Sequence, residues 1–130
     1  MKFTICGSAR FESEYHEWNK KLGLMGHISY SLMTFPSVEG DKSWYTEDEK
    51  ETLDLAHLAK IEESDAILIL NKDQYIGDST RREIKWARLR GKMRFWLEIC
   101  PESELIKKTT NGMGADYSVS KLPNLTGVIL

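Results

Sequence analysis

Residues 65–92, with the sequence DAILILNKDQYIGDSTRREIKWARLRGK, decide the fold of this chain. The apolar run 66–70 ends at Asn71 and has the length and composition of a buried strand. A polar Gly/Ser loop over 72–80 follows, and a helical pattern covers 80–90. A strand, a loop and a helix N-terminus in succession gather backbone N–H groups and the positive end of a helix dipole at one point. That arrangement suits an anion such as phosphate.

Three further strands are predicted, at 2–6, 27–33 and 93–99, from short runs rich in apolar and β-branched residues. The signal is weaker in the C-terminal part of the chain. Residues 109–120 are rich in turn formers, whereas 125–130, with the sequence LTGVIL, are predicted to be a last strand or a docked tail.

Two further helices are predicted. The first has Ser8 as its cap and ends at Gly23 or Gly26. The second opens with a capping box formed by Thr46 and Glu49 and runs to about residue 63. The expected apolar side of this second helix comprises Leu55, Leu58, Ala59 and Ile61.

Strands that alternate with helices form β-α-β units, which predict a parallel sheet with helices on both faces. The length of the chain predicts one α/β domain over 1–130, and right-handed crossovers between parallel strands limit the possible strand orders. Its sheet is predicted to be small, doubly wound and flavodoxin-like, with strand order 2-1-3-4-5. In that order the chain reverses direction between strands one and three, and ligands bind beyond the carboxyl ends of these strands. The loops 7–10 and 72–80 leave them, so both Gly/Ser loops are predicted to lie at this switch point.

Composition excludes some classes of partner. The 130-residue chain is 29% charged with a net charge of −2, so it has no basic excess for duplex nucleic acid or an anionic membrane. No apolar run has membrane-spanning length or the form of a signal peptide. Cys6 and Cys100 lack the spacing of a zinc site or a disulfide framework, and no histidine lies near them in sequence. We therefore expect reduced thiols in a cytoplasmic protein without a metal or cofactor.

A small anionic ligand needs only a few well-placed groups, and the two loops supply candidates. In the first loop, Gly7 allows close backbone approach, Ser8 offers a hydroxyl, and Arg10 offers paired donors to phosphate or carboxylate. The same residues also fit an ordinary strand-to-helix turn in which Ser8 is the cap and Arg10 is solvated. The substrate-binding candidates in and beside the second loop are Asn71, Gly77, Asp78, Ser79 and Thr80.

Glu83 is the candidate catalytic residue, and two interpretations of it stay open. Thr80 and Glu83 fit a capping box, in which the carboxylate only accepts a backbone hydrogen bond. Alternatively, Ile84, Ala87 and Gly91 mark the sheet-facing stripe of the helix, so Glu83 borders this stripe and points toward the cleft. A carboxylate there can act as a nucleophile or a general base.

His57 and Asp65 are two further titratable residues near the predicted sheet. Lone helical histidines are usually packed or solvated, yet His57 lies at a point along its helix from which it can reach the pocket above strand three. Asp65 precedes that strand and therefore lies at the amino end of the sheet, away from the switch point. We retain His57 as a substrate-binding candidate and assign Asp65 to a structural turn.

Three short motifs occur together in a particular order and spacing. They are Cys6-Gly7-Ser8-Ala9-Arg10 after the first strand, Ser64-Asp65 before the third, and Glu83 ahead of Arg90-Gly91-Lys92. Together they resemble the nucleoside 2-deoxyribosyltransferase superfamily, which includes the 2′-deoxynucleoside 5′-monophosphate N-hydrolases and small phage or bacterial relatives. The resemblance covers about residues 2–99 and implies the same small parallel sheet.

The resemblance implies cleavage of an N-glycosidic bond in a nucleotide or nucleoside. The family's glutamate, which matches Glu83, attacks C1′ of the deoxyribose and forms a glycosyl-enzyme that water or a second base resolves, as in retaining glycosidases. The loop matching 7–10 lies against the nucleotide, and the loop matching 77–80 holds sugar or phosphate. Related enzymes are homo-oligomers, commonly with a pocket completed by a neighbouring subunit.

The chain departs from the family pattern in two places. Many relatives carry Asp where this chain has His57, which leaves the acid partner unassigned. Relatives also often have a Gly-x-Glu-x-Gly-like setting around the nucleophile, whereas Arg81, Arg82 and Lys85 surround Glu83 here. The second departure favours either a more anionic substrate or a loss of catalysis.

Two hypotheses from different classes follow. The first is an N-glycosidase or nucleoside deoxyribosyltransferase-like enzyme in which Glu83 is the nucleophile. The second is a nucleotide-binding module without chemistry, such as a sensor or a sequestering protein, in which Glu83 is a cap. A panel of deoxynucleosides and their 5′-monophosphates distinguishes the two, because only the enzyme releases free base.

Overall fold

The computed structural model of the chain describes residues 1–32, 34–35, 45–99 and 115–126. The strands are β1 (Lys2–Gly7), β2 (Ile28–Tyr30), β3 (Ala66–Leu70), β4 (Met93–Trp96) and β5 (Asp116–Ser118). The helices are α1 (Glu12–Leu24), α2 (Glu47–Glu63) and α3 (Asp78–Leu89), with short 3-10 turns η1 (Ala9–Phe11), η2 (Lys72–Gln74) and η3 (Val119–Lys121). No helix within these described ranges is both long enough and apolar enough to cross a membrane.

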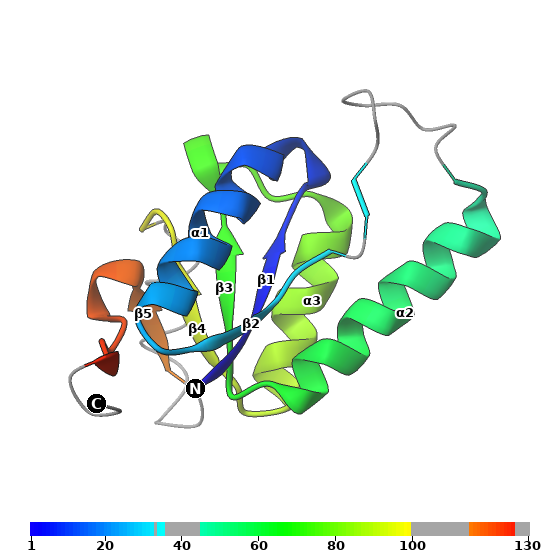
Figure 1. The fold of residues 1–130 in the computed structure, drawn as a ribbon. Coiled ribbons are helices and arrows are strands. Elements are labelled where there is room, and N and C mark those ends of the chain that lie inside the picture. Colours follow the sequence, from blue (N-terminus) through cyan, green and yellow to red (C-terminus); the bar gives the residue numbers. More distant parts are fainter. Residues whose placement is uncertain (33, 36–44, 100–114, 127–130) are drawn as a thin grey trace.

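The strands of the described sheet pair in parallel in the order β2-β1-β3-β4-β5. The predicted α/β fold with strand order 2-1-3-4-5 is therefore confirmed. Helix α1 covers one face of the sheet, and α2 and α3 lie next to each other on the other face (Figure 1). Because β1 and β3 are parallel neighbours, the loops after them leave the sheet at the same edge, and the strand order reverses between them.

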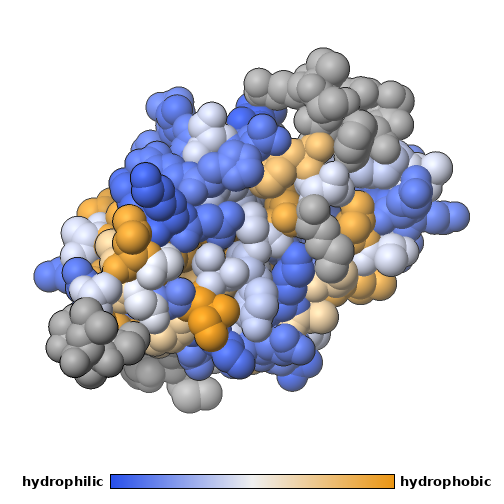
Figure 2. Space-filling model, in the orientation of Figure 1, coloured by the Kyte–Doolittle hydropathy of each residue, from blue (hydrophilic) through white to orange (hydrophobic). Residues whose placement is uncertain are grey.

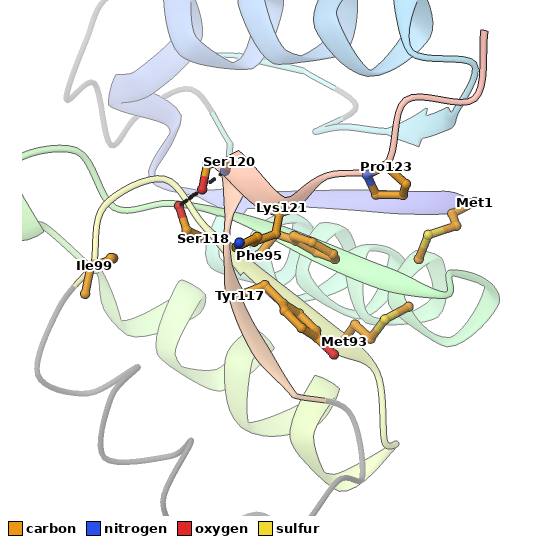
Figure 3. Close-up of a pocket in the computed structure, with 9 residues that line it drawn as sticks. All are labelled: Met1, Met93, Phe95, Ile99, Tyr117, Ser118, Ser120, Lys121 and Pro123. Carbon is orange, nitrogen blue, oxygen red and sulfur yellow. Dashed lines mark hydrogen bonds between the residues drawn. The ribbon is translucent and has the colours of Figure 1, made fainter. Parts of the chain in front are cut away.

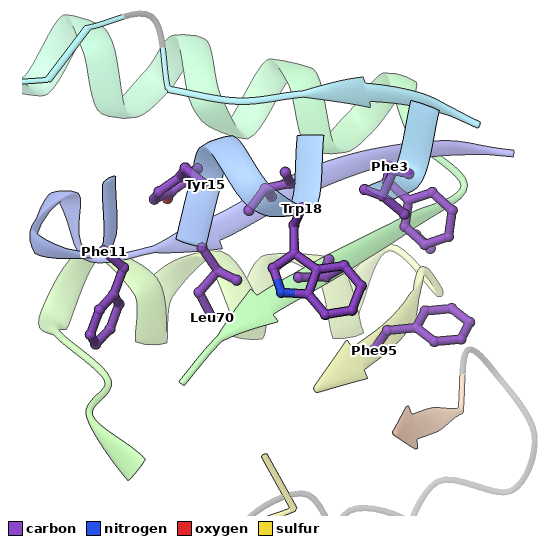
Figure 4. Packing of buried hydrophobic residues seen from close by; sticks show 10 residues of the cluster. Phe3, Phe11, Tyr15, Trp18, Leu70 and Phe95 are labelled. Carbon is purple, nitrogen blue, oxygen red and sulfur yellow. The ribbon is translucent and has the colours of Figure 1, made fainter. Parts of the chain in front are cut away.

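Alternation of side chains along the strands divides the core into two clusters. On the α1 face, Phe3 packs with Tyr15 and Trp18, and the aromatic side chains of α1 point at the strands (Figure 4). On the opposite face, Cys6 packs with residues of β3, β4 and α3, among them Ile67 and Ile84. β3 itself is buried along its whole length, as its uninterrupted apolar sequence predicts.

Helix α1 begins later than its predicted cap. The Ser8 hydroxyl accepts a hydrogen bond from the backbone N of Arg10 at 3.3 Å and so caps η1, and α1 starts after this turn. The outer surface of α1 is mainly hydrophilic (Figure 2), which agrees with a single buried stripe on the helix. The buried residues of that stripe are Tyr15, Trp18 and Leu22.

The predicted capping box of α2 is confirmed. Thr46 Oγ1 accepts from the backbone N of Glu49 at 3.1 Å, and Glu49 Oε1 accepts from the backbone N of Thr46 at 2.9 Å. The predicted apolar side of this helix is partly wrong, because Leu55 is 58% exposed whereas His57 and Ile61 are buried. His57 and Ile61 are one turn apart and therefore lie on the same, sheet-facing side.

Several predicted boundaries are also wrong. β2 ends at Tyr30, and β4 ends at Trp96. Soon after Trp96 the chain leaves the strand ladder, and Glu98 donates its backbone N–H to the Asn71 side chain at 2.8 Å. β5 comes from the segment predicted to be turns. Of the two alternatives for 125–130, the strand is wrong for Leu125 and Thr126, whereas Leu125 donates its backbone N–H to the Met25 carbonyl at 2.8 Å, as a docked tail would; residues 127–130 lie outside the described residues. Cys100 lies outside them as well.

A buried ion pair joins β5 to β4. Arg94 and Asp116 are register partners, with Nε to Oδ1 at 2.9 Å and Nη2 to Oδ2 at 3.1 Å. Trp96 Nε1 donates to the same carboxylate at 2.8 Å. Both charged side chains are essentially inaccessible to solvent. The edge strand of only three residues is therefore held by side chains as well as by its backbone ladder.

Candidate active site

Cys6, His57 and Glu83 meet near the carboxyl end of β1. Cys6 is the penultimate residue of β1, His57 lies on α2, and Glu83 lies on α3. One atom of each side chain, a thiol sulfur, a ring nitrogen and a carboxylate oxygen, lies within 4.8 Å of the other two. Cys6 is fully buried, and His57 and Glu83 are 3% and 7% exposed. The fold thus brings the candidate catalytic residue and the candidate histidine together, and we call these three residues the buried triad.

Glu83 does not cap α3. The helix begins at Asp78, and its N-cap is Gly77, whose backbone is extended and which makes no side-chain capping bond. The backbone N of Arg81 already donates to the Gly77 carbonyl at 3.0 Å, so Glu83 lies beyond the unpaired first turn. Thr80 lies in the first turn of the helix and is not its cap. The capping-box interpretation is therefore wrong, and the carboxyl group has no capping role.

Burial raises the pKa of the Glu83 carboxyl to about 8, and the negative charge of Asp54 contributes to the increase. Cys6 and the cations Arg82 and Lys50 act in the opposite direction but do not cancel it. At neutral pH most molecules therefore carry a protonated Glu83. A carboxyl group with such a pKa can exchange its proton near physiological pH, which an ordinary glutamate cannot do.

His57 is neutral at the same pH. Burial, followed by the charge of Lys60, lowers the pKa of its imidazole to about 4. Its Nε2 lies 3.7 Å from Glu83 Oε1, which is beyond hydrogen-bond length. Among the residues that the structure describes, neither ring nitrogen has a hydrogen-bond partner of ordinary geometry, and the nearby backbone of Ile5 only partly opposes the decrease in pKa. Burial likewise raises the pKa of the Cys6 thiol, so all three members of the triad are uncharged at neutral pH.

A charged network lies beside the triad and is formed by residues that precede His57 in α2 and Glu83 in α3. Lys50 Nζ donates to Asp54 Oδ2 at 2.8 Å and to Ser79 Oγ at 3.1 Å. Arg82 Nη2 lies 3.2 Å from the same Asp54 oxygen. Two cations therefore share one carboxylate, so the three side chains carry a formal charge of +1 and tie α2 to the start of α3.

The two switch-point loops contact each other. The Arg10 guanidinium lies 3.8 Å from the centre of the Tyr75 ring, a cation–π distance, and Phe11 meets the same ring edge to face. Below them, β1 and β3 approach so closely at Gly7 that a Cβ atom there would lie 2.9 Å from the Cβ of Leu70. The predicted candidates Gly7 and Arg10 thus lie where the two loops meet.

The candidates of the second loop have varied surroundings. Asn71 is buried, and its side-chain amide makes two hydrogen bonds with the backbone of Glu98. It donates to the Glu98 carbonyl at 2.7 Å and accepts from the Glu98 N–H at 2.8 Å. This contact joins the ends of β3 and β4, so Asn71 has a structural role and its contact with a substrate stays a prediction. Asp78 is exposed at the first position of α3, whereas Thr80 is buried.

Three residues of this region were not among the predicted site residues: Cys6, Asp54 and Tyr75. Alternation along β1 contains a signal for Cys6, because it places this residue on the face opposite to Ile5 at the carboxyl end of the strand. Asp54 lies one turn before His57, and Tyr75 lies in the switch-point loop. No histidine lies near Cys6 in sequence, yet the fold places His57 of α2 beside it.

A hollow of about 600 Å³ occurs elsewhere in the described structure (Figure 3). Its lining includes Met93, Phe95 and Tyr117, which pack on the α1 side of the sheet. Cys6 belongs to the cluster on the opposite side. The hollow and the buried triad therefore lie on different faces of the sheet.

The fold is a nucleoside 2-deoxyribosyltransferase-like fold, as solved structures that align with nearly the whole chain show. The structure aligns with a 2-deoxyribosyltransferase from the psychrotolerant bacterium Bacillus psychrosaccharolyticus over 95% of this chain and 97% of that one, with a TM-score of 0.58 and 18% identity. The CMP N-glycosidase BcmB of Clostridium botulinum aligns over 93% and 92%, with a TM-score of 0.54 and 17% identity. A conserved protein from Enterococcus faecalis V583 aligns over 98% and 84%, with a TM-score of 0.52 and 17% identity. No protein-family model and no curated protein sequence matches the chain.

Proposed function

We propose that the protein cleaves the N-glycosidic bond of a nucleoside or nucleotide, or transfers its sugar, with Glu83 as the nucleophile. The observation that supports this most is the burial of Glu83 against His57 and Cys6 at the switch point, where it has no structural hydrogen bond to a helix end. A carboxyl pKa raised to about 8 at a ligand-binding position is typical of functional groups. The solved structures that share the fold include a 2-deoxyribosyltransferase and a CMP N-glycosidase, which supports the proposal that this protein also acts on an N-glycosidic bond.

In the proposed reaction, an ionised Glu83 oxygen attacks C1′ while the bond between C1′ and the base nitrogen breaks. The bonding electrons leave with the base, which takes up a proton, and the sugar becomes an ester of Glu83. Water then attacks C1′, releases the sugar and regenerates the carboxylate, or a second base attacks and yields a new nucleoside. The positive charge that develops on the sugar is stabilised by the carboxylate in this water-poor site.

We further propose that the two switch-point loops hold the substrate. The net positive charge of the Lys50, Asp54 and Arg82 network favours a substrate that carries a phosphate, so 5′-monophosphates should have a lower KM than the corresponding nucleosides. The residues proposed to contact sugar or phosphate are Gly7, Ser8, Arg10, His57, Asn71, Gly77, Asp78, Ser79 and Thr80.

The test is release of free base from a panel of deoxynucleosides and their 5′-monophosphates, followed by chromatography. We expect at least one substrate to be cleaved, and Glu83→Gln to reduce the rate at least about 1000-fold. Glu51→Gln, at an exposed position of α2, is the matched control and should keep full activity. Equal activity in Glu83→Gln would exclude the nucleophile, and saturable nucleotide binding without turnover would support the non-catalytic module instead.

We also propose that the protein is a homo-oligomer, from its resemblance to oligomeric enzymes. Helices α2 and α3 each present an exposed leucine, Leu55 at 58% and Leu89 at 80% exposure, which supports contacts between copies. Size-exclusion chromatography with light scattering should give a mass that is a multiple of 15.0 kDa, and the mass of a single chain would exclude the proposal.

A further inference from the structure

The buried triad also combines the three side-chain types that bind transition metals. A thiol, an imidazole and a carboxyl come from three different elements, β1, α2 and α3, and their ligand atoms lie within 4.8 Å of one another. Among the described residues, this is the group whose atoms are close enough to share one ion. Three protein ligands with a fourth position open is a common arrangement for zinc.

The imidazole of His57 gives a second and independent indication. It is 3% exposed, and neither ring nitrogen has a hydrogen-bond partner of ordinary geometry among the described residues, although the backbone of Ile5 lies near enough to favour the protonated imidazole. A buried polar group without a partner costs roughly 1–3 kcal/mol, so native proteins rarely retain one without a reason. A metal ion would use one of these nitrogens as a ligand.

The geometry needs little adjustment to accept an ion. In a tetrahedral zinc site with bonds of about 2.0–2.3 Å, neighbouring ligand atoms lie about 3.3–3.7 Å apart. His57 Nε2 and Glu83 Oε1 are already separated by 3.7 Å. The distances from the Cys6 sulfur to the other two ligand atoms are at most 4.8 Å, so they would have to shorten by no more than about 1.5 Å to reach this spacing.

The ligand chemistry selects a class of ion. Thiolate sulfur and imidazole nitrogen favour Zn²⁺ and related borderline ions, whereas Mg²⁺ and Ca²⁺ prefer oxygen ligands. Binding displaces the thiol and carboxyl protons to solvent, and the resulting thiolate and carboxylate balance the two positive charges of the ion. A neutral complex is the kind of charge arrangement that a buried site tolerates.

We propose that Cys6, His57 and Glu83 bind one Zn²⁺ or similar transition-metal ion, and that the bound ion inhibits the enzyme by occupying the Glu83 carboxylate. Metal binding stands independently of the reaction, whereas the inhibition rests on the proposed function. A micromolar level of free zinc would then act as a reversible off-switch for glycosidic cleavage.

The test is the metal content of the chelator-treated protein after dialysis against micromolar Zn²⁺ and gel filtration. A Cys100→Ser background leaves Cys6 as the sole thiol, because the chain has two cysteines. We expect one zinc per chain, and an affinity at least ten-fold lower in Cys6→Ser and in His57→Asn. His16→Asn, at an exposed position of α1, is the control and should bind zinc normally.

Cobalt provides a readout that does not depend on activity. Co²⁺ in the site should give a thiolate-to-cobalt absorption band in the near ultraviolet that is absent from Cys6→Ser. No retained metal in the parent protein, or equal metal in parent, Cys6→Ser and His57→Asn, would overturn the site. Bound zinc that leaves base release unchanged would overturn the inhibition but not the metal site. If the protein is inactive on every substrate, the metal measurement alone decides whether the site binds zinc.

Discussion

At the scale of single residues, the proposed chemistry depends on Glu83, and the burial of this residue has an energetic cost. Its carboxyl group is buried between α2 and the sheet, beside the neutral groups His57 and Cys6. Burial stabilises the protonated form, while the proposed reaction needs the ionised form. Activity and stability should therefore depend on pH in opposite directions.

The rate of base release should rise with pH. For a nucleophile whose pKa is raised to about 8, kcat/KM should increase about tenfold per pH unit below pH 8 and level off above it. The groups that face Glu83 are Cys6 from β1, His57, Asp54 and Lys50 from α2, and Arg82 from its own helix. This dependence is tested by measuring the rate of base release from pH 6 to 9 in a buffer that contains a chelator.

The variant Asp54→Asn tests whether this pH dependence comes from Glu83. Because the Asp54 charge raises the pKa of Glu83, removing this charge should shift the rising limb to lower pH. A rate that stays constant from pH 6 to 9, or an unchanged profile in Asp54→Asn, would contradict this assignment.

Glu83→Gln should be more stable than the wild-type protein at alkaline pH. The folded-state pKa of about 8 exceeds the unfolded value near 4.5, so the folded protein binds an extra proton between these pH values. Stability is therefore lost as pH rises through this window, by up to about 5 kcal/mol above pH 8. Glutamine cannot ionise and avoids this loss.

Urea unfolding of both proteins at pH 5 and pH 9 measures the difference. We expect similar free energies of unfolding at pH 5 and a clear advantage for Glu83→Gln at pH 9. A variant that is less stable at both pH values would show that Glu83 stabilises the fold and is not held there for chemistry.

At the scale of elements, the switch point depends on how closely β1 and β3 approach each other. The Tyr15 hydroxyl donates to the Gly7 carbonyl at 2.7 Å, so α1 also fixes the end of β1. Gly7 has no room for a side chain beside Leu70. The loop with Ser8 and Arg10 is thus positioned by packing beneath it.

Gly7→Ala should destabilise the protein by about 1–3 kcal/mol, because the new methyl group would lie 2.9 Å from the Cβ of Leu70. Gly23→Ala is the matched control, since a Cβ atom at this position of helix α1 would have nothing within 4 Å. That substitution should stabilise the helix by about 0.5–1 kcal/mol. Thermal or urea unfolding compares them, and equal effects of the two substitutions would contradict the close contact.

Elements were predictable where a strong periodic or capping signal exists. The apolar run of β3 and the capping box of Thr46 both lead directly to the observed structure. The buried side of α2 was not predictable from apolarity, since His57 faces the sheet while Leu55 faces solvent. The helix start at Asp78 was missed because its cap, Gly77, carries no side chain to signal it.

At the scale of the whole molecule, the alternation of strands and helices was enough to predict the order of the sheet. Its last strand was not predictable, because β5 depends on a partner rather than on its own sequence. The Asp116 carboxylate binds Arg94 and Trp96 across the edge of the sheet. The buried triad was unpredictable for the same reason, since Cys6, His57 and Glu83 lie on three separate elements.

Replacing Asp116 alone should be severely destabilising. Asp116→Leu leaves the buried Arg94 without this carboxylate, which costs about 3–5 kcal/mol. The double variant Arg94→Met/Asp116→Leu removes both charges and should recover most of that loss. Urea unfolding of the three proteins measures the coupling, and a double variant whose loss equals the sum of the single losses would contradict the pairing.

The central claim, that Glu83 is a nucleophile, is tested most directly by trapping the sugar on the protein. Acid quenching during turnover of a cleaved substrate, followed by peptide mass spectrometry, should reveal the mass of one substrate-derived glycosyl group on the peptide with Glu83. The same peptide of Glu83→Gln should carry no adduct. An adduct on another residue, or base release by Glu83→Gln at the wild-type rate, would contradict the account.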